Sequence, residues 1–308
     1  MNWNNYYKVV ENILKKFPLE WQKNYEENKK DVIIKKEEVS KSKIFGNYDN
    51  EKNIITLYNE ESLPHELFHM AFRNRNKLNQ KLFEDANLIY DNGVAYHDLE
   101  GNIYGNALTE GFVEYLSRKC SSLKGHNMEY YFVNLLIQIH GEEILKYSLT
   151  NDSLNFYQDK CFSTIHEIRK ELDLLMSSSR NIQIISIFKD IFIENLNNNE
   201  YIKETYQFMK IIKDDYINAI VRLFNLITIE YINTFNPQVS INEFINLLND
   251  FLVNKDYQVS FYLAEIESYP LKEKVEEIIN NFKLEYKIVK KKWRKIFIFY
   301  INLISFSE

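Results

Sequence analysis

The chain has 308 residues, of which 45% are hydrophobic, and a formal net charge of −6. This length and apolar content support one large domain or two ordinary ones with a full hydrophobic core. The mild acidity, with no dominant basic stripe, argues against nucleic acid as a partner. Cys120 and Cys161 are the only cysteines, too few for a disulfide framework.

The part of the chain up to Tyr58 is predicted to form helices followed by short strands. Residues 3–30 have the pattern of two helices broken at Pro18, with an apolar face formed by Tyr7, Val10, Ile13 and Leu14. Three short extended runs follow, at 32–34, 43–45 and 54–57. The segment 46–50 is predicted to be the turn between the last two runs. We therefore expect a small, mostly antiparallel sheet.

The strongest chemical signal follows these strands, in the segment His65-Glu66-Leu67-Phe68-His69. Ser62 as an N-cap and Pro64 in the first turn predict that a helix begins here. Two histidines four residues apart lie on one face of a helix, so both imidazoles can bind one metal ion. The glutamate between them is placed as the general base that polarises a water molecule in zinc hydrolases.

A glycine-rich segment comes next and is predicted to form a wall of the active-site cleft. Four of the seven glycines in the chain lie between residues 93 and 111. Residues 94–97 and 102–104 are predicted to be short extended segments around a turn. Three side chains of this segment are candidates for stabilising an oxyanion by hydrogen bonding, with ordinary packing as the alternative: Tyr96, His97 and Tyr104.

A second helix is predicted over residues 109–116, and it carries Glu110 and Glu114 on one face. Zinc in a catalytic site takes three protein ligands and leaves one position open, so either carboxylate is a candidate third ligand. Gly111 in the middle of this helix costs about 1 kcal/mol relative to alanine. The close approach of another helix would explain it.

The two helical motifs together resemble those of the gluzincin metallopeptidases, which include the thermolysin-like enzymes and the M1-type aminopeptidases. The resemblance covers roughly residues 50–120 and implies that Glu110 is the third zinc ligand. It also implies that Glu114 orients His65 through a hydrogen bond, as carboxylates behind metal-binding histidines do. The chain departs from the family in the segment between His69 and Glu110, which is longer than in the best-known members. It also lacks the aminopeptidase Gly-x-Met-x-Asn signature, so exopeptidase activity is not implied.

Three further histidines lie downstream, where gluzincins place a tyrosine or histidine that faces the oxyanion: His126, His140 and His166. His166-Glu167 repeats the start of the motif, but Lys170 stands where a second histidine would be required, so no second metal site is expected. His140 ends an apolar run beside Gly141, and a helix C-terminus favours a cation there. We therefore expect a structural role for His140.

The remainder of the chain is predicted to be helical. No glycine occurs after Gly141, and apolar residues recur there at helical spacing. We expect a zincin-like catalytic domain over residues 1–120 and a helical domain over 121–308 that closes the cleft. One or more of its helices should bring a tyrosine or histidine within reach of the oxyanion.

The C-terminal tail carries an apolar run, residues 296–304, directly after a cluster of Lys and Arg. The run is too short to span a bilayer, so a buried terminal helix is expected, with an interfacial membrane contact as the alternative. The N-terminus lacks the layout of a signal peptide, which predicts a cytoplasmic protein.

The sequence thus predicts an α+β fold and a zinc-dependent metallopeptidase that acts on a peptide or protein substrate. Zn²⁺ would be held by His65, His69 and Glu110, and Glu66 would be the general base. One alternative is a zinc-binding but non-proteolytic regulatory or interaction protein with a helical recognition domain. Another is a purely helical interaction protein in which the motif is incidental.

Overall fold

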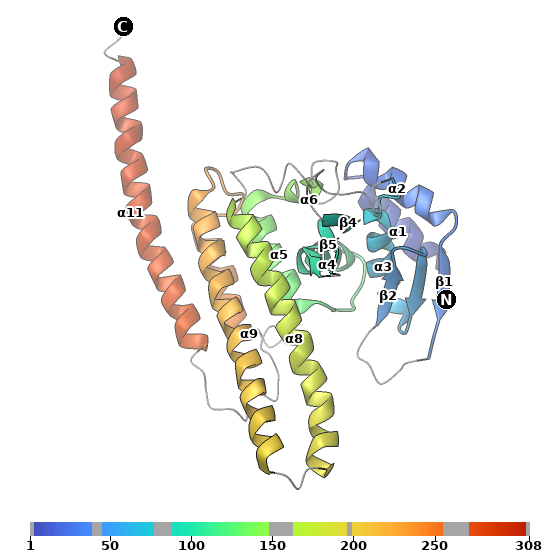
Figure 1. Ribbon diagram of the computed structural model, residues 1–308. Helices are drawn as coiled ribbons and strands as arrows, with labels where there is room; N and C mark the ends of the chain where they lie inside the picture. The colour runs from blue at the N-terminus through green and yellow to red at the C-terminus, as the bar shows by residue number, and fades with distance from the viewer. Residues whose placement is uncertain are drawn as a thin grey trace.

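Figure 1 shows the computed structural model of the chain, which describes residues 3–38, 45–76, 88–100, 102–147, 163–195, 199–254 and 271–305. It begins with two helices, α1 (Asn4–Leu14) and α2 (Leu19–Lys29), on either side of Pro18 as predicted. Val10 and Leu14 of α1 are buried, so the predicted apolar face is confirmed.

The strands form two small three-stranded sheets. In the first, β1 (Ile33–Lys36) runs parallel to β3 (Ile54–Leu57), and β2 (Gly46–Asp49) runs antiparallel to β3 on its other side. The second sheet is antiparallel and consists of β4 (Leu88–Asn92), β5 (Ala95–Asp98) and β6 (Ile103–Tyr104). The α+β class is confirmed, and the segments predicted to be extended at 94–97 and 102–104 overlap β5 and β6 of the second sheet. The first sheet is mixed rather than mostly antiparallel, because β1 and β3 are parallel.

The turn predicted over residues 46–50 is also wrong, because residues 46–49 are strand β2. The chain reverses instead over residues 50–53, where Asn53 adopts a left-handed φ of 56°. Asp49 accepts a hydrogen bond from the backbone N–H of Lys52, and the Tyr48 hydroxyl donates to Asn53. Asparagine and aspartate therefore make this turn, and Gly46 serves another purpose at the candidate site.

Both predicted motif helices are present. α3 (Leu63–Phe72) follows the short 3₁₀ helix η1 (Glu60–Ser62), and α4 (Asn106–Ser117) follows β6. Ser62 occupies the N-cap position of α3 but makes no capping hydrogen bond, because its hydroxyl donates to the carbonyls of Phe45 and Asn59. The apolar face of α4 is fully buried and consists of Leu108, Phe112, Val113 and Leu116.

The described residues after Gly141 contain helices and no strands, as predicted. The helices from α5 onward are α5 (Asn127–His140), α6 (Ile144–Tyr147), α8 (Ser163–Asn195), α9 (Asn199–Asn233), α10 (Ile241–Val253) and α11 (Leu271–Ser305). α8 and α9 form a long hairpin that packs on α4 and α5 (Figure 1). Asp173 of α8 accepts hydrogen bonds from the N–H groups of Gly105 and Ala107 at the start of α4. One continuous core runs from Val10 to Phe282, across the domain boundary predicted at residue 120.

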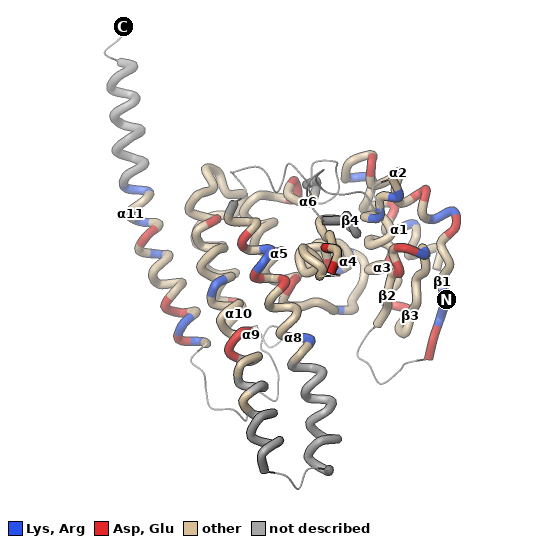
Figure 2. The backbone as a smooth tube through the Cα atoms, viewed as in Figure 1, with Lys and Arg blue, Asp and Glu red and all other residues tan. Residues whose placement is uncertain are grey.

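α11 is the last helix and reaches beyond the rest of the molecule (Figure 1). Figure 2 shows acidic and basic residues along its first turns. The apolar run predicted to be a buried or membrane-contacting tail lies outside the residues whose side chains are described. Within the described part of the chain, no helix combines the length and apolarity needed to cross a membrane.

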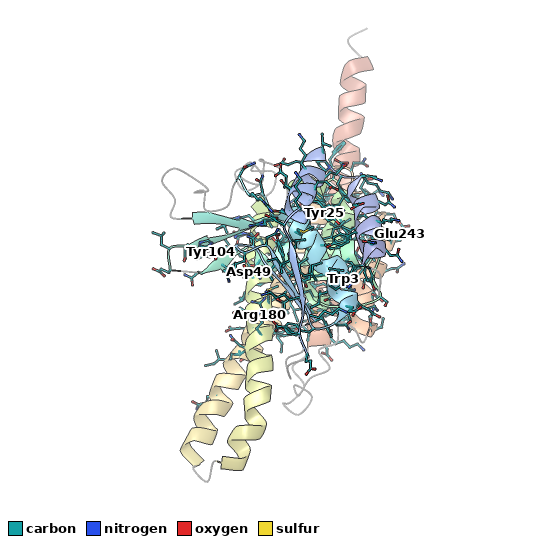
Figure 3. All side chains as sticks on the ribbon, turned by 90° about the vertical axis from the view of Figure 1, so that its right-hand side faces the viewer. Trp3, Tyr25, Asp49, Tyr104, Arg180 and Glu243 are labelled. Carbon is teal, nitrogen blue, oxygen red and sulfur yellow. The ribbon has the colours of Figure 1, made fainter. Side chains whose placement is uncertain are left out.

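The N-terminal helices, which face the viewer in Figure 3 with Trp3 and Tyr25 labelled, hold the end of α3. Asn28 of α2 is fully buried, and its amide donates to the carbonyls of Met70 and Arg73 at 2.9 Å each. Its side-chain oxygen accepts hydrogen bonds from Arg73 and Arg75. α2 therefore satisfies the backbone groups that α3 leaves open where it ends.

Gly111 lies where α4 crosses α5. A Cβ atom at this position would lie 2.4 Å from Cγ2 of Val133 and 2.8 Å from the backbone oxygen of Glu129. The expected reason for a glycine in mid-helix, close approach of a second helix, is thus confirmed.

We predict that Gly111→Ala destabilises the fold. Overpacking of a tight core site costs about 1–3 kcal/mol, which exceeds the roughly 1 kcal/mol gained from the helix propensity of alanine. Urea unfolding followed by circular dichroism measures the change. Adding Val133→Ala should recover only part of the loss, since the Glu129 carbonyl remains in place. An unchanged unfolding midpoint for Gly111→Ala would contradict the close crossing.

Candidate metal centre

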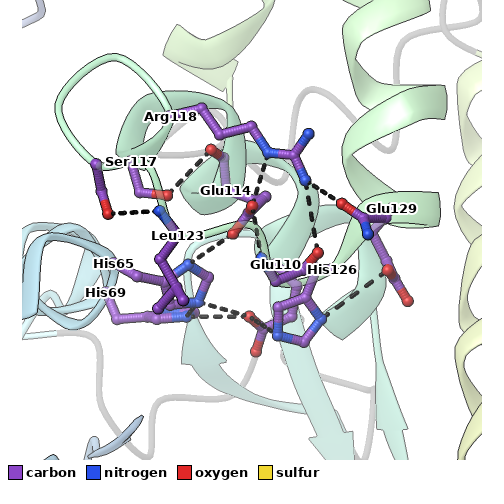
Figure 4. Close-up of polar contacts among 12 residues, drawn as sticks. His65, His69, Glu110, Glu114, Ser117, Arg118, Leu123, His126 and Glu129 are labelled. Carbon is purple, nitrogen blue, oxygen red and sulfur yellow. Dashed lines mark hydrogen bonds and ion pairs between the residues drawn. The ribbon is translucent and has the colours of Figure 1, made fainter. Parts of the chain in front are cut away.

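Helices α3 and α4 bring three side chains of the predicted site together (Figure 4). Nε2 of His69 lies 3.2 Å from Nε2 of His65 and 3.1 Å from Oε2 of Glu110. Nε2 of His65 lies 3.3 Å from the same carboxylate oxygen. The three side chains are 11–15% exposed, so they are largely buried but not fully enclosed.

Glu114 lies behind His65 and fixes its orientation. Nδ1 of His65 is 3.2 Å from Oε2 of Glu114, whose other oxygen accepts hydrogen bonds from Arg118 Nε at 2.7 Å and from the Gly125 N–H at 3.0 Å. Burial would raise the pKa of Glu114, but His65 and Arg118 lower it to about 2. The ionised carboxylate therefore keeps the proton of neutral His65 on Nδ1 and leaves a lone pair on Nε2.

This arrangement fits a bound cation. The unprotonated Nε2 of His65 lies 3.3 Å from Oε2 of Glu110. Two such lone-pair donors repel each other unless a proton or a metal ion lies between them. Without a metal ion, the effect of burial on the pKa of His65 is outweighed by hydrogen bonds to Glu110 and Glu114, which raise it to about 10, so a proton on Nε2 would supply the positive charge that a metal ion could replace. The ligand atoms of His65, His69 and Glu110 lie within 4.8 Å of one another, so these residues could hold a metal ion.

Glu66, the predicted general base, lies beside this group. Its side chain is only 4% exposed. Burial raises its pKa, and this effect outweighs the nearby charges of His65 and His69. A Cβ atom on Gly46 would lie 2.6 Å from the Glu66 carboxylate and 2.6 Å from the Ser62 hydroxyl. Gly46 is therefore the residue that leaves room for Glu66 beneath strand β2.

His126 is the downstream histidine that reaches the group. Its Nε2 lies 3.4 Å from Oε2 of Glu110, and its ring stacks on that of His65 with centroids 5.5 Å apart. Nδ1 of His126 is 3.9 Å from the buried carboxylate of Glu129, and the side chain is 35% exposed. Sequence spacing alone does not distinguish His126 from His140 and His166, because the position of His126 depends on how the chain connects α4 to α5.

The other two downstream histidines have different surroundings. His140 ends α5 as expected, and its Nε2 lies 2.8 Å from Glu230 of α9. His166 lies on α8, and burial lowers its pKa. Within the described part of the chain, neither belongs to a group of metal-ligand type.

The predicted oxyanion candidates Tyr96, His97 and Tyr104 lie on the β5–β6 hairpin, and the contacts of the two tyrosines are with α8 and within this hairpin. Arg169 of α8 donates a hydrogen bond to the Tyr96 hydroxyl at 2.8 Å, and the Tyr104 hydroxyl donates to Asp98 at 3.0 Å. The two tyrosine rings stack 5.5 Å apart, and His97 pairs with Ile103 in the β5–β6 register. These contacts tie the hairpin to α8 and to itself.

The chain matches no protein-family model, no curated protein and no solved structure. The gluzincin resemblance therefore depends on the two helical motifs and on the way α3 and α4 place them.

We predict that Gly46→Ala displaces the Glu66 carboxylate and destabilises the fold by about 1–3 kcal/mol, the usual range for overpacking. The cause is steric, because Gly46 has no left-handed φ that alanine could not adopt. A crystal structure of the variant would show the carboxylate moved, and urea unfolding would give the energy. Asn47→Ala, on the exposed neighbour in β2, is the matched control and should change neither.

Proposed function

We propose that this protein is a zinc-dependent metallopeptidase of gluzincin type. The observation that carries the proposal is the convergence of two imidazole nitrogens and a carboxylate oxygen from α3 and α4, with Glu114 fixing the tautomer of His65. Two nitrogen donors and one oxygen donor form the ligand set that catalytic zinc takes in this class of hydrolase, with a further position open for water or substrate.

A zinc ion held by these residues would lower the pKa of water and polarise a peptide carbonyl. Glu66 would accept the proton released by the attacking water and pass it to the leaving amine. Burial suits Glu66 to this role, since a carboxylate with a raised pKa is a stronger base.

His126 is the residue proposed to meet the negative charge that develops on the carbonyl oxygen. It is the most exposed imidazole of the cluster, at 35%, and it stacks on His65. A hydrogen-bond donor held in advance where charge develops lowers the barrier without reorganisation during the reaction. The buried Glu129 carboxylate beside Nδ1 would keep the ring oriented.

We predict that Glu66→Gln retains zinc and loses peptidase activity. The amide is nearly isosteric with the carboxylate, and Glu66 is not in the ligand group, so the zinc content should stay at one ion per chain. Loss of a general base typically lowers the rate by about 10²–10⁴-fold. Metal analysis together with cleavage of a mixed peptide library measures both quantities.

Glu61→Gln is the matched control, because Glu61 is an exposed glutamate in η1, close to Glu66 in the chain. It should behave as the unaltered protein. Zinc bound with no cleavage by the unaltered protein would favour the non-proteolytic zinc-binding alternative. Failure to bind zinc would contradict the proposal altogether.

We further predict that Glu110→Ala weakens zinc binding more than Glu114→Ala. The loss of a carboxylate that orients a ligand usually costs about 10- to 100-fold in metal affinity, whereas loss of a ligand removes both a bond and a compensating charge. Competition with a chelator at several concentrations ranks the variants. Glu114→Gln, which retains an acceptor for Arg118, separates the effect on zinc from a general loss of stability. The opposite order would make Glu114 the ligand.

A further inference from the structure

A groove lies between α10 and α11, two helices that take no part in the candidate metal centre. It has a volume of about 720 Å³, and its apolar lining comes from Ile241 and Ile245 of α10 and Tyr286 of α11. The opposite face of α10 is used by the core, where Phe244 and Leu248 are fully buried. Among the described residues, the groove is therefore left open beside α10, which is anchored in the core on its other side.

Four lysines of α11 line the same groove: Lys283, Lys287, Lys290 and Lys291. The first three have helical spacings of four and three residues, so they form one stripe along α11. Within the described part of the chain, none of the four pairs with a carboxylate. The Nζ atom of Lys290 lies 5.7 Å from the centre of the Tyr286 ring, at the edge of the apolar floor.

The local charge contrasts with that of the whole chain. The net charge of the protein is −6, yet residues 283–295 contain seven Lys or Arg residues and a single acidic one, Glu285. Within this stretch, residues 283–291, which include the groove-lining part of α11, contain four lysines and one glutamate. A ligand that fills the groove must supply apolar groups to its floor and negative charge to its rim.

We propose that this groove binds an acidic amphipathic helix of a partner protein. The stretch from Lys283 to Lys291 is about 12 Å long at roughly 1.5 Å per residue, which matches about two turns of a bound helix. Apolar side chains at i, i+3 and i+4 would enter the groove, the usual mode by which an amphipathic helix is held. Carboxylates on the adjacent face would meet the lysine stripe. A flat anionic membrane would reach the lysines but not the floor formed by Ile241 and Ile245.

This surface is separate from the candidate metal centre. α11 and α3 lie at opposite sides of the molecule, with α9 and α5 between them (Figure 1). The partner would therefore be held whether or not the histidine–glutamate group cleaves peptides.

The test uses the full-length protein and a short fluorescent peptide of high helix propensity. The peptide carries leucine on one face and glutamate at i, i+4 and i+7 on the adjacent face. Fluorescence polarisation should show at least tenfold tighter binding than to a scrambled peptide of the same composition. Lys287→Glu with Lys290→Glu should weaken binding at least tenfold, and so should Ile245→Ser. Binding should also weaken with added salt, since rim charges are screened.

The matched control is Lys8→Glu with Lys23→Glu, which makes the same change in net charge at exposed positions of α1 and α2. It should leave peptide binding unchanged, and circular dichroism should show the same helix content for all variants. Equal binding of the scrambled peptide would overturn the proposal. So would binding to mixed phosphatidylcholine–phosphatidylserine vesicles that depends on the lysines and not on Ile245, since that result assigns the surface to a membrane.

Discussion

The arrangement of the candidate site depends on the contacts that the buried Glu114 carboxylate makes. It joins three segments, since its partners are His65 on α3, Arg118 just after α4 and the backbone of Gly125 in the loop before α5. A buried charge is costly unless it is fully paired, so these three segments are held in one arrangement. Because His126 follows Gly125 directly, the same carboxylate also sets where that imidazole enters the cluster.

The helical part of the chain supports this arrangement from the other side of α4. α5 crosses α4 closely enough to require a glycine at 111, and Asp173 of α8 accepts the free N–H groups at the start of α4. An aspartate at a helix N-terminus satisfies orphan donors and complements the helix dipole. α4 is therefore fixed along its length and at its beginning, which is the rigidity that a helix needs if it is to hold a ligand in place.

Features that depend on residues close together in the sequence can be predicted from local sequence patterns. The helix boundaries around Pro18, the two motif helices and the close approach at Gly111 all follow from periodicity, spacing or propensity. A glycine can be required either for an unusual backbone conformation, as in a turn, or for space beside its Cα atom. Gly46 belongs to the second case, because a Cβ atom there would meet the Glu66 carboxylate, and the sequence alone does not show this contact. The parallel β1–β3 pair and the place of His126 depend on packing between distant segments, which no local pattern records.

Asn28 links the N-terminal helices to α3, the helix that carries His65 and His69. Its single side chain serves two carbonyls and two guanidinium groups at the far end of α3. A fragment that began at the first sheet would lose these hydrogen bonds and would expose to water the apolar side chains of α3 that α1 and α2 cover. The N-terminal helices are thus part of the smallest unit that can keep His65 and His69 in place, although neither helix contributes a residue to the cluster. Insertions in exposed surface loops should therefore be tolerated better than deletions at this end of the chain.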